Sequence, residues 1–338
     1  MSTTATGPAP TTSRRVTGLL VLVALLAVLA VLSVVLGSRS MSLPEVWSGL
    51  TDADSDAYPV VTELRLPRTV LGLAAGAALG LAGALMQAMT RNPLADPGLL
   101  GVNTGAAAAV VTAAHFIGLS SFTGTLVFAF LGAAVAAVAC YLIAGAAGAT
   151  PARLALAGAA VTAAGYAYVS AVQLLDSATL EQMRFWSVGS LVNAHTVPIA
   201  PVIGLIVIAG IAGVALAGPL NALALGDATA TGLGVDPRTL RVVGIGVITV
   251  LAGTATAACG PIVFVGLVIP HMVRFHTGPD QNWVLPYSML TGAAFLLAAD
   301  VIGRVVARPS ELQVGIVCAV VGGPFFLYLV SRRKVARL

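Results

Sequence analysis

The residues of this chain that could do chemistry are few, and most of them are arginines. Only 9% of the 338 residues are charged, against roughly 25% in a soluble domain. Arg65 and Arg68 lie three residues apart, and Asp300 and Arg304 lie four apart, so each pair could share a helical face. An aspartate and an arginine at this spacing can form an ion pair with each other, and we expect Asp300 and Arg304 to do so. For Arg65 and Arg68 the charge leaves two readings open, snorkelling to lipid headgroups and docking of an acidic partner.

Catalytic and metal-binding chemistry finds little support among the other residues. The only lysine, Lys334, lies near the C-terminus and cannot complete the Gly-rich loop of a P-loop ATPase. Cys140, Cys259 and Cys318 are isolated in apolar stretches, and the four histidines share no ligand spacing. No paired carboxylates or nucleophile–base pair are visible, so we predict neither an enzyme nor a cofactor on this chain. The pI of 9.3 reflects basic loops around membrane spans, and nucleic acid is not an expected partner.

The elements that must position these residues are membrane helices. With 58% hydrophobic residues and a mean hydropathy of +0.98, the chain has no polar coat for a soluble globule. A spanning helix needs about 20 apolar residues, and the sequence divides into ten such stretches in an all-α polytopic membrane protein. The predicted spans are 17–37, 68–90, 98–118, 122–147, 152–175, 197–217, 240–258, 262–275, 284–304 and 313–331. The span 262–275 is the shortest and its full crossing stays open.

The basic residues orient the spans. With the N-terminus inside, six arginines fall outside and the other 11 of the 17 basic residues fall on the cytoplasmic side, which predicts that both termini are cytoplasmic. Residues 1–15 are rich in Ser, Thr, Pro and Ala and are predicted to form a disordered cytoplasmic N-terminus. Residues 16–334 then form a single transmembrane domain in the plasma membrane.

The longest cytoplasmic connection, 220–241, is more than a linker. Small apolar residues alternate with polar ones, which predicts two short helices separated by Gly232–Gly234, with Asp236 opening the next span. A helix lying on lipid would carry a basic polar face, but this connection has no basic residue before Arg238. A protein-binding surface is therefore favoured.

Five strings of the sequence, in order, resemble one known family. They are LRLPRTVLGLAAGAALGLAGALMQAMTRNPLADPGLLGVNTGA (64–106), RFWSVGSL (184–191), LNALALGDATATGLG (220–234), GPIVFVGLVIPHMVR (260–274), and a fifth that runs from Ala299-Asp300 through GRVVARPSELQVGI (303–316) to GGPFFLYLV (322–330). The chain resembles FecCD-type permeases, the membrane subunits of bacterial ABC importers for ferric siderophores, haem and cobalamin. The resemblance covers nearly the whole chain after residue 60.

The resemblance implies partners and an architecture. It implies the type II ABC importer permease fold, with about ten helices and alternating access between two permease copies or homologues. Two ATP-binding subunits would dock on the cytoplasmic face and hold ATP and Mg²⁺. An extracytoplasmic binding protein or lipoprotein would deliver the cargo.

The resemblance also implies roles for particular residues. It implies that the binding protein docks on the outward-facing arginines Arg65, Arg68 and Arg304. Coupling to the ATPase falls to Leu223, Ala224, Leu225, Gly226, Asp227, Thr231, Gly232 and Gly234. It implies that a cytoplasmic gate is formed by Asn92, Pro93 and Leu94, with Thr150 as a further candidate. Gly158, Gly165 and Ser170 are small residues that could line the path beside a second copy.

The cargo is left open between related compounds. The string Trp186–Leu191 is more similar to ferric-siderophore members of the family than to cobalamin members, and haem remains an alternative. A secondary transporter would need an acidic or histidine relay inside the spans, and the spans are almost free of such residues. An iron-siderophore permease is therefore the favoured function.

Overall fold

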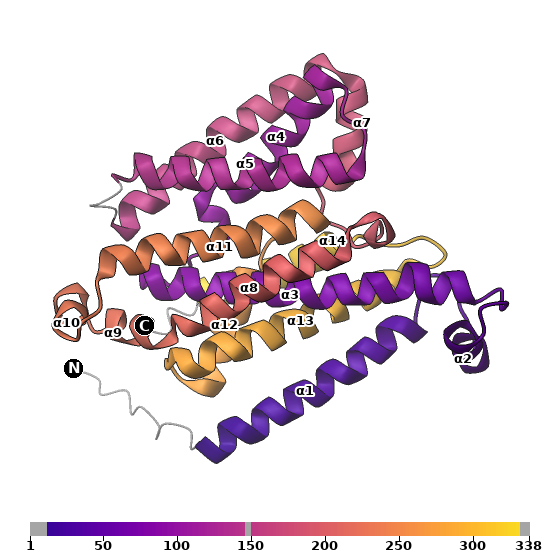
Figure 1. Cartoon of the computed structure of the whole chain (residues 1–338), viewed down its shortest axis with the longest axis horizontal. Coiled ribbons are helices and arrows are strands. Elements are labelled where there is room, and N and C mark those ends of the chain that lie inside the picture. Colours follow the sequence, from indigo (N-terminus) through magenta and orange to yellow (C-terminus); the bar gives the residue numbers. More distant parts are fainter. Residues whose placement is uncertain (1–11, 146–149, 332–338) are drawn as a thin grey trace.

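The computed structural model describes residues 12–145 and 150–331, and all regular structure in these ranges is helical (Figure 1). The long helices are α1 (Thr12–Val35), α3 (Leu66–Thr90), α4 (Val102–Ile117), α5 (Phe122–Ile143), α6 (Pro151–Leu175), α8 (Ile199–Ala215), α11 (Pro237–Cys259), α12 (Val265–Thr277), α13 (Gln281–Val306) and α14 (Val314–Ser331). The short elements are α2 (Leu43–Thr51), η1 (Pro59–Arg65), η2 (Pro97–Leu100), α7 (Ser177–Trp186), η4 (Ala194–Thr196), α9 (Ala217–Ala224) and α10 (Asp227–Gly232).

Each predicted span corresponds to one of these long helices. Within the described ranges, six helices are long and apolar enough to cross a membrane, and the pair α8–α9, bent by 44°, would make a seventh. Helices α4 and α14 are shorter apolar helices. Helix α12 has 13 residues, a length of about 20 Å against a hydrocarbon core of about 30 Å. The predicted span 262–275 is thus shorter than a membrane crossing.

Helix α3 forms the centre of the bundle and packs against α11, α12 and α13. Gly72, Gly76 and Gly80 recur every four residues on α3 and face α13. A Cβ atom on Gly76 or Gly80 would overlap the backbone oxygen of Gly292 or Ser288. Stripes of small residues let helix backbones approach closely in membranes, where the hydrophobic effect does not drive helix association. The glycines therefore set the short distance between α3 and α13.

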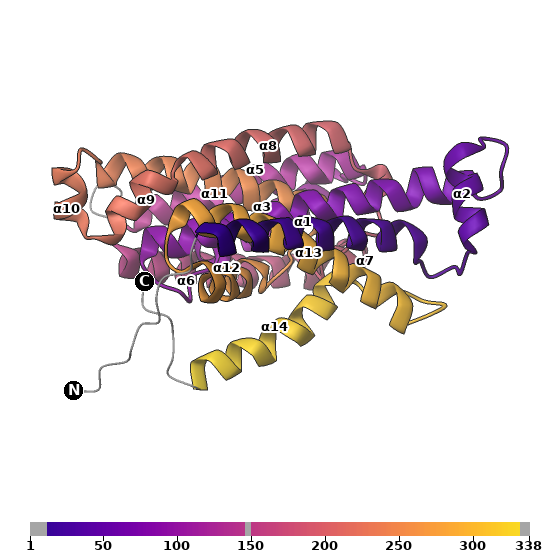
Figure 2. The same cartoon turned by 90° about the horizontal axis from the view of Figure 1, so that it is seen from below.

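The two ends of the bundle carry different connections. Helices α2 and α7 lie at one end and α9 and α10 at the other, and α14 leaves the bundle at an angle (Figures 1 and 2). The helical stretch 59–90 runs between these ends, with Arg65 and Arg68 toward α2 and Arg91 toward α10. The excess of basic residues assigns the α9–α10 end to the cytoplasm.

One boundary differs from the predictions, and one helix was not predicted. Helix α1 begins at Thr12, so 12–15 are helical and not disordered, and 1–11 lie outside the described residues. The last residues of the predicted span 122–147 and of the predicted domain 16–334 lie outside them too. Helix α2 was not predicted, although the sequence holds its signal. Ser42 and Glu45 form a reciprocal capping box at its start.

Candidate functional site

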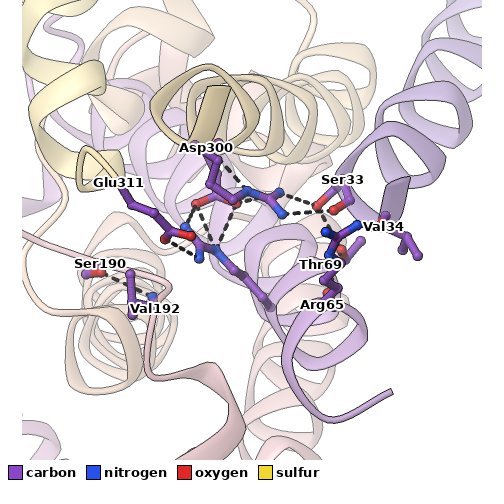
Figure 3. Close-up of polar contacts among 10 residues, drawn as sticks. Ser33, Val34, Arg65, Thr69, Ser190, Val192, Asp300 and Glu311 are labelled. Carbon is purple, nitrogen blue, oxygen red and sulfur yellow. Dashed lines mark hydrogen bonds and ion pairs between the residues drawn. The ribbon is translucent and has the colours of Figure 1, made fainter. Parts of the chain in front are cut away.

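Buried charges at the extracytoplasmic end join α3 to α13 (Figure 3). Asp300 is fully buried and accepts hydrogen bonds from Nε (3.1 Å) and Nη2 (2.8 Å) of Arg68. Its other oxygen lies 2.8 Å from Nη2 of Arg304, which confirms the predicted pair. Arg304 also donates to the backbone oxygen and the hydroxyl of Ser33 on α1, at 2.9 and 2.8 Å. One carboxylate thus holds two arginines and, through Arg304, links three helices.

Arg65 has a different set of partners. Its guanidinium donates to the backbone oxygens of Val34 (2.8 Å), Val35 (2.7 Å) and Arg39 (2.7 Å), at and just beyond the end of α1. Gly37 makes this approach possible, because a Cβ atom there would lie 2.6 Å from Nη2 of Arg65. Arg65 therefore satisfies carbonyl groups left without partners where α1 ends.

Arg68 has a second acidic partner, Glu311, on the segment 307–313 between α13 and α14. The Oε2 atom of Glu311 lies 2.7 Å from Nη1 of Arg68, and the Glu311 side chain is 22% exposed. Burial alone would raise the pKa of Glu311, but the neighbouring Arg68 guanidinium outweighs it and holds the pKa below its usual range. The sequence reasoning missed Glu311, although it lies in one of the matching strings.

The three docking candidates differ in one respect from the prediction. Their side chains are not free and outward-facing, because Arg65, Arg68 and Arg304 are 5%, 7% and 1% exposed and are paired within the chain. An unpaired charge near the membrane boundary is costly. Carboxylate and carbonyl groups of the same chain therefore bind the guanidinium groups of these arginines. All three nevertheless line one open hollow of about 350 Å³, together with Arg39, His195 and Glu311. We call it the arginine hollow.

A second and larger space lies beside the arginine hollow. This outer cavity of about 660 Å³ is lined by Phe122, Trp186, Ser190, Asn193, Gln313 and Glu311, among others. The indole nitrogen of Trp186 is buried there without a hydrogen-bond partner among the described residues. Because Glu311 and Val192 line both spaces, the two are neighbours.

The cytoplasmic connection forms two short helices, as predicted, but the break between them differs. Helix α9 ends at Ala224 and α10 starts at Asp227, so the break falls at Gly226 (φ 109°) and not at Gly232–Gly234. Gly234 (φ 83°) lies just beyond the end of α10 instead. Among the coupling candidates Leu223 is fully buried, whereas Ala224, Leu225, Asp227, Thr231, Gly232 and Gly234 are exposed. The exposed set forms a surface turned away from the bundle.

Asp227 connects this surface to two long helices. Its carboxylate pairs with Arg91, which ends α3 in a left-handed conformation (φ 48°), and lies 2.7 Å from Nη2 of Arg241 on α11. Burial alone would raise the pKa of Asp227, but hydrogen bonds from Arg241 and Arg91 outweigh it and lower the pKa. Neither arginine was predicted as a partner of Asp227, because Arg91 is 136 positions away and Arg241, 14 positions away, lies on the next helix.

The gate candidates lie next to Arg91. Asn92 starts a turn in which its side-chain oxygen accepts a hydrogen bond from the Leu94 backbone (3.0 Å) and its backbone oxygen one from Ala95 (3.1 Å). Thr150 lies elsewhere, as the N-cap of α6, where its hydroxyl accepts from the Arg153 backbone at 3.4 Å. The turn 92–95 is thus tied to α10 through the neighbouring Arg91.

Two of the three proposed path residues face neighbouring helices of the same subunit. A Cβ atom on Gly158 would overlap the backbone oxygen of Leu99, and one on Gly165 would lie 3.0 Å from the Cβ atom of Thr104. These glycines let α6 pack against η2 and α4 of the same subunit, and a role for them in lining a path stays a prediction. Ser170 is exposed on the opposite face of α6.

Comparisons with known proteins agree on one family. The model of the FecCD transport family matches residues 25–332. The chain is 44% identical to the ferric enterobactin transport system permease protein of Escherichia coli (strain K12), over 96% of this chain and 97% of that one. It is 36% identical to the hemin transport system permease protein of Yersinia pestis, over 94% and 95% of the two chains. A solved metal-chelate type ABC transporter in an inward-facing conformation superposes with a TM-score of 0.84 at 29% identity, covering 94% of this chain and 99% of that one.

Proposed function

This chain belongs to the FecCD transport family and is a multi-pass membrane permease of a bacterial ABC importer, without an ATPase site of its own; we propose that its cargo is a ferric siderophore. The 44% identity to a ferric enterobactin permease over nearly the full length of both chains carries this proposal. Relatives named for hemin, at 36% identity, and for cobalamin, at 37%, keep those cargoes as the alternative.

We propose that the arginine hollow receives acidic side chains of an extracytoplasmic binding protein. Four arginines line it, and Arg–carboxylate pairs across an interface fix register and speed encounter. Because the arginines are already paired within the chain, docking exchanges partners and does not capture free cations. Net positive charge around the hollow favours that exchange.

We propose that the exposed surface of α9 and α10 docks one of two ATP-binding subunits. Leu225 and Leu233 are 65% and 61% exposed there, which is unusual for leucines on the aqueous side and fits a covered surface. Movement of α10 would reach the gate turn 92–95 through the Asp227–Arg91 pair.

We propose that the exposed face of α6 meets a second permease copy or a homologous permease. This face is rich in small residues, which favour close helix contacts in a membrane. They are Ala159, Ala160, Ala163, Ala164, Ala167, Ser170 and Ala171.

Uptake in a strain lacking this permease tests the cargo. Labelled ferric siderophore, haem and cobalamin are supplied in turn to the deletion strain with and without the restored gene. Siderophore uptake that depends on this gene and on the partner ATPase is the expected result. Restored uptake of haem or cobalamin alone would contradict the proposal that the cargo is a ferric siderophore. Uptake that survives loss of the ATPase but collapses with the proton gradient would contradict the ATP-driven mechanism.

A further inference from the structure

One acidic residue separates the two spaces at the extracytoplasmic end. Glu311 lines the arginine hollow on one side and the outer cavity on the other. It lies on the segment 307–313, which joins α13 to α14. A change in the position of this side chain is therefore felt in both spaces.

The hydrogen bonds of Arg68 are divided between a fixed and an accessible partner. Asp300 is fully buried and takes Nε and Nη2, and it comes from the interior of α13. Glu311 takes the remaining nitrogen, Nη1, and is 22% exposed. An acidic group that enters the hollow from outside therefore meets Glu311 as its competitor, and not Asp300.

The segment that carries Glu311 is held by backbone hydrogen bonds on the C-terminal side of that residue. The Leu312 amide donates to the oxygen of Gly303 at 3.1 Å, and the Gly315 amide donates to the oxygen of Gly189 at 3.1 Å. Gly315 packs so closely on Val188 that a Cβ atom would overlap its backbone oxygen. Just before these anchors, the ion pair with Arg68 fixes the Glu311 side chain on the cavity wall.

We propose that Glu311 is an internal occupant of the docking site: it pairs with Arg68 in place of a carboxylate of the binding protein. It holds Arg68 while the permease is free, and a carboxylate of the extracytoplasmic binding protein replaces it, which releases Glu311 and the adjacent Ser310 on the wall of the outer cavity. This rests on the docking role proposed above. Binding outside is thereby converted into a change at the cavity that lies beside the docking hollow.

The test measures the affinity of the binding protein for the assembled transporter in lipid nanodiscs. Glu311→Gln keeps the shape of the side chain and removes the charge that competes for Arg68. We expect binding that is about two- to fivefold tighter, the range that one partly exposed ion pair supports. Glu181→Gln is the matched control, because Glu181 also lines the outer cavity but pairs with Arg184. It should leave the affinity within about twofold.

Two further measurements separate the possible failures. Arg68→Gln should weaken binding. Arg68→Gln could weaken binding while Glu311→Gln binds no tighter than wild type in an intact complex. That result would refute Glu311 as the internal occupant but would support the docking role of Arg68. If Arg68→Gln binds like wild type, docking and the occupant both fall.

A spin label at the exposed position of Ser310, introduced as Ser310→Cys, reports the release directly. In an otherwise wild-type chain its mobility should rise when the binding protein is added. With Glu311→Gln it should be high from the start. A label that stays equally immobile in all states would refute the release.

Discussion

Removal of Asp300 should be among the most damaging single changes in this protein. Asp300→Ala deletes a fully buried carboxylate that accepts three hydrogen bonds from Arg68 and pairs with Arg304. Arg68 would keep Glu311, and Arg304 would keep Ser33, but two guanidinium groups would lose the charge between them. Breaking a buried ion pair by removing one partner costs about 3–5 kcal/mol. That is a large share of a typical unfolding free energy of about 5–15 kcal/mol.

The effect is measurable as thermal unfolding of the purified permease in detergent, followed by circular dichroism. At about 2–3 °C per kcal/mol, Asp300→Ala should lower the Tm by roughly 6–15 °C. Asp300→Asn keeps an acceptor of the same shape and should lose less. A Tm within a degree or two of wild type would show that the arginines find other partners, and would refute the reasoning.

A double-mutant cycle tests whether the cost comes from the uncompensated charge. Arg304→Met in the Asp300→Ala background removes one of the two stranded cations, so the two changes should cost less together than their sum. The expected coupling is about 0.5–3 kcal/mol. Strict additivity would mean that the carboxylate stabilises the bundle through something other than the charge of Arg304.

Three further predictions concern other parts of the chain. Asp227→Asn weakens the ties to Arg91 and Arg241 and should lower cargo transported per ATP hydrolysed by about two- to tenfold in proteoliposomes, a range set by the loss of two partly exposed ion pairs. Gly83→Ala places a Cβ atom against the backbone oxygen of Gly266 and should lower Tm and assembly yield, with a cost of about 1–3 kcal/mol or more. Asp176 caps α7, and hydrogen bonds from Thr179 and then His115 lower the pKa of its carboxyl group. The ionised carboxylate therefore stabilises the folded protein above the unfolded pKa of about 3.9. This stabilisation is lost as the pH falls below that value. Asp176→Asn should therefore reduce the loss of stability in acid, as seen by unfolding at stepwise lower pH.

Matched variants make these three outcomes decisive. Asp236→Asn alters another cytoplasmic aspartate, the cap of α11, and should not change transport per ATP. Gly246→Ala adds a Cβ atom where nothing lies within 4 Å, and should leave Tm unchanged. Equal effects of each test variant and its control would contradict the coupling and packing arguments. An acid unfolding profile that Asp176→Asn leaves unaltered would contradict the third.

The helices were predictable because each needs a long apolar stretch, and the ten predicted spans all correspond to helices. What composition could not supply was which face of a helix packs inward. Gly158 and Gly165 illustrate this, because a glycine serves close packing and an open path equally well. Their neighbours on η2 and α4 show that both pack inward, and those contacts come from the fold.

The charged residues show the same limit in another form. The Asp300–Arg304 pair was predictable because both residues lie on one helix at a fixed spacing. The pairs of Arg68 with Asp300 and Glu311 join residues 232 and 243 positions apart, and no local pattern reports such a distance. The same holds for Asp227 and Arg91, 136 positions apart. Sequence placed these groups at the correct end of the molecule but not in contact.

The bonds between Arg304 and Ser33 also constrain how the protein is made. Helix α1 packs mainly on α13, and the two residues are 271 positions apart. Before α13 is inserted, α1 can already be held by Arg65, which binds the carbonyl groups at its C-terminal end, and by the hydrogen bond between Ser33 and Thr69 at 2.8 Å. The bonds from Arg304 come later, so the packing of α1 is completed in two steps during membrane insertion.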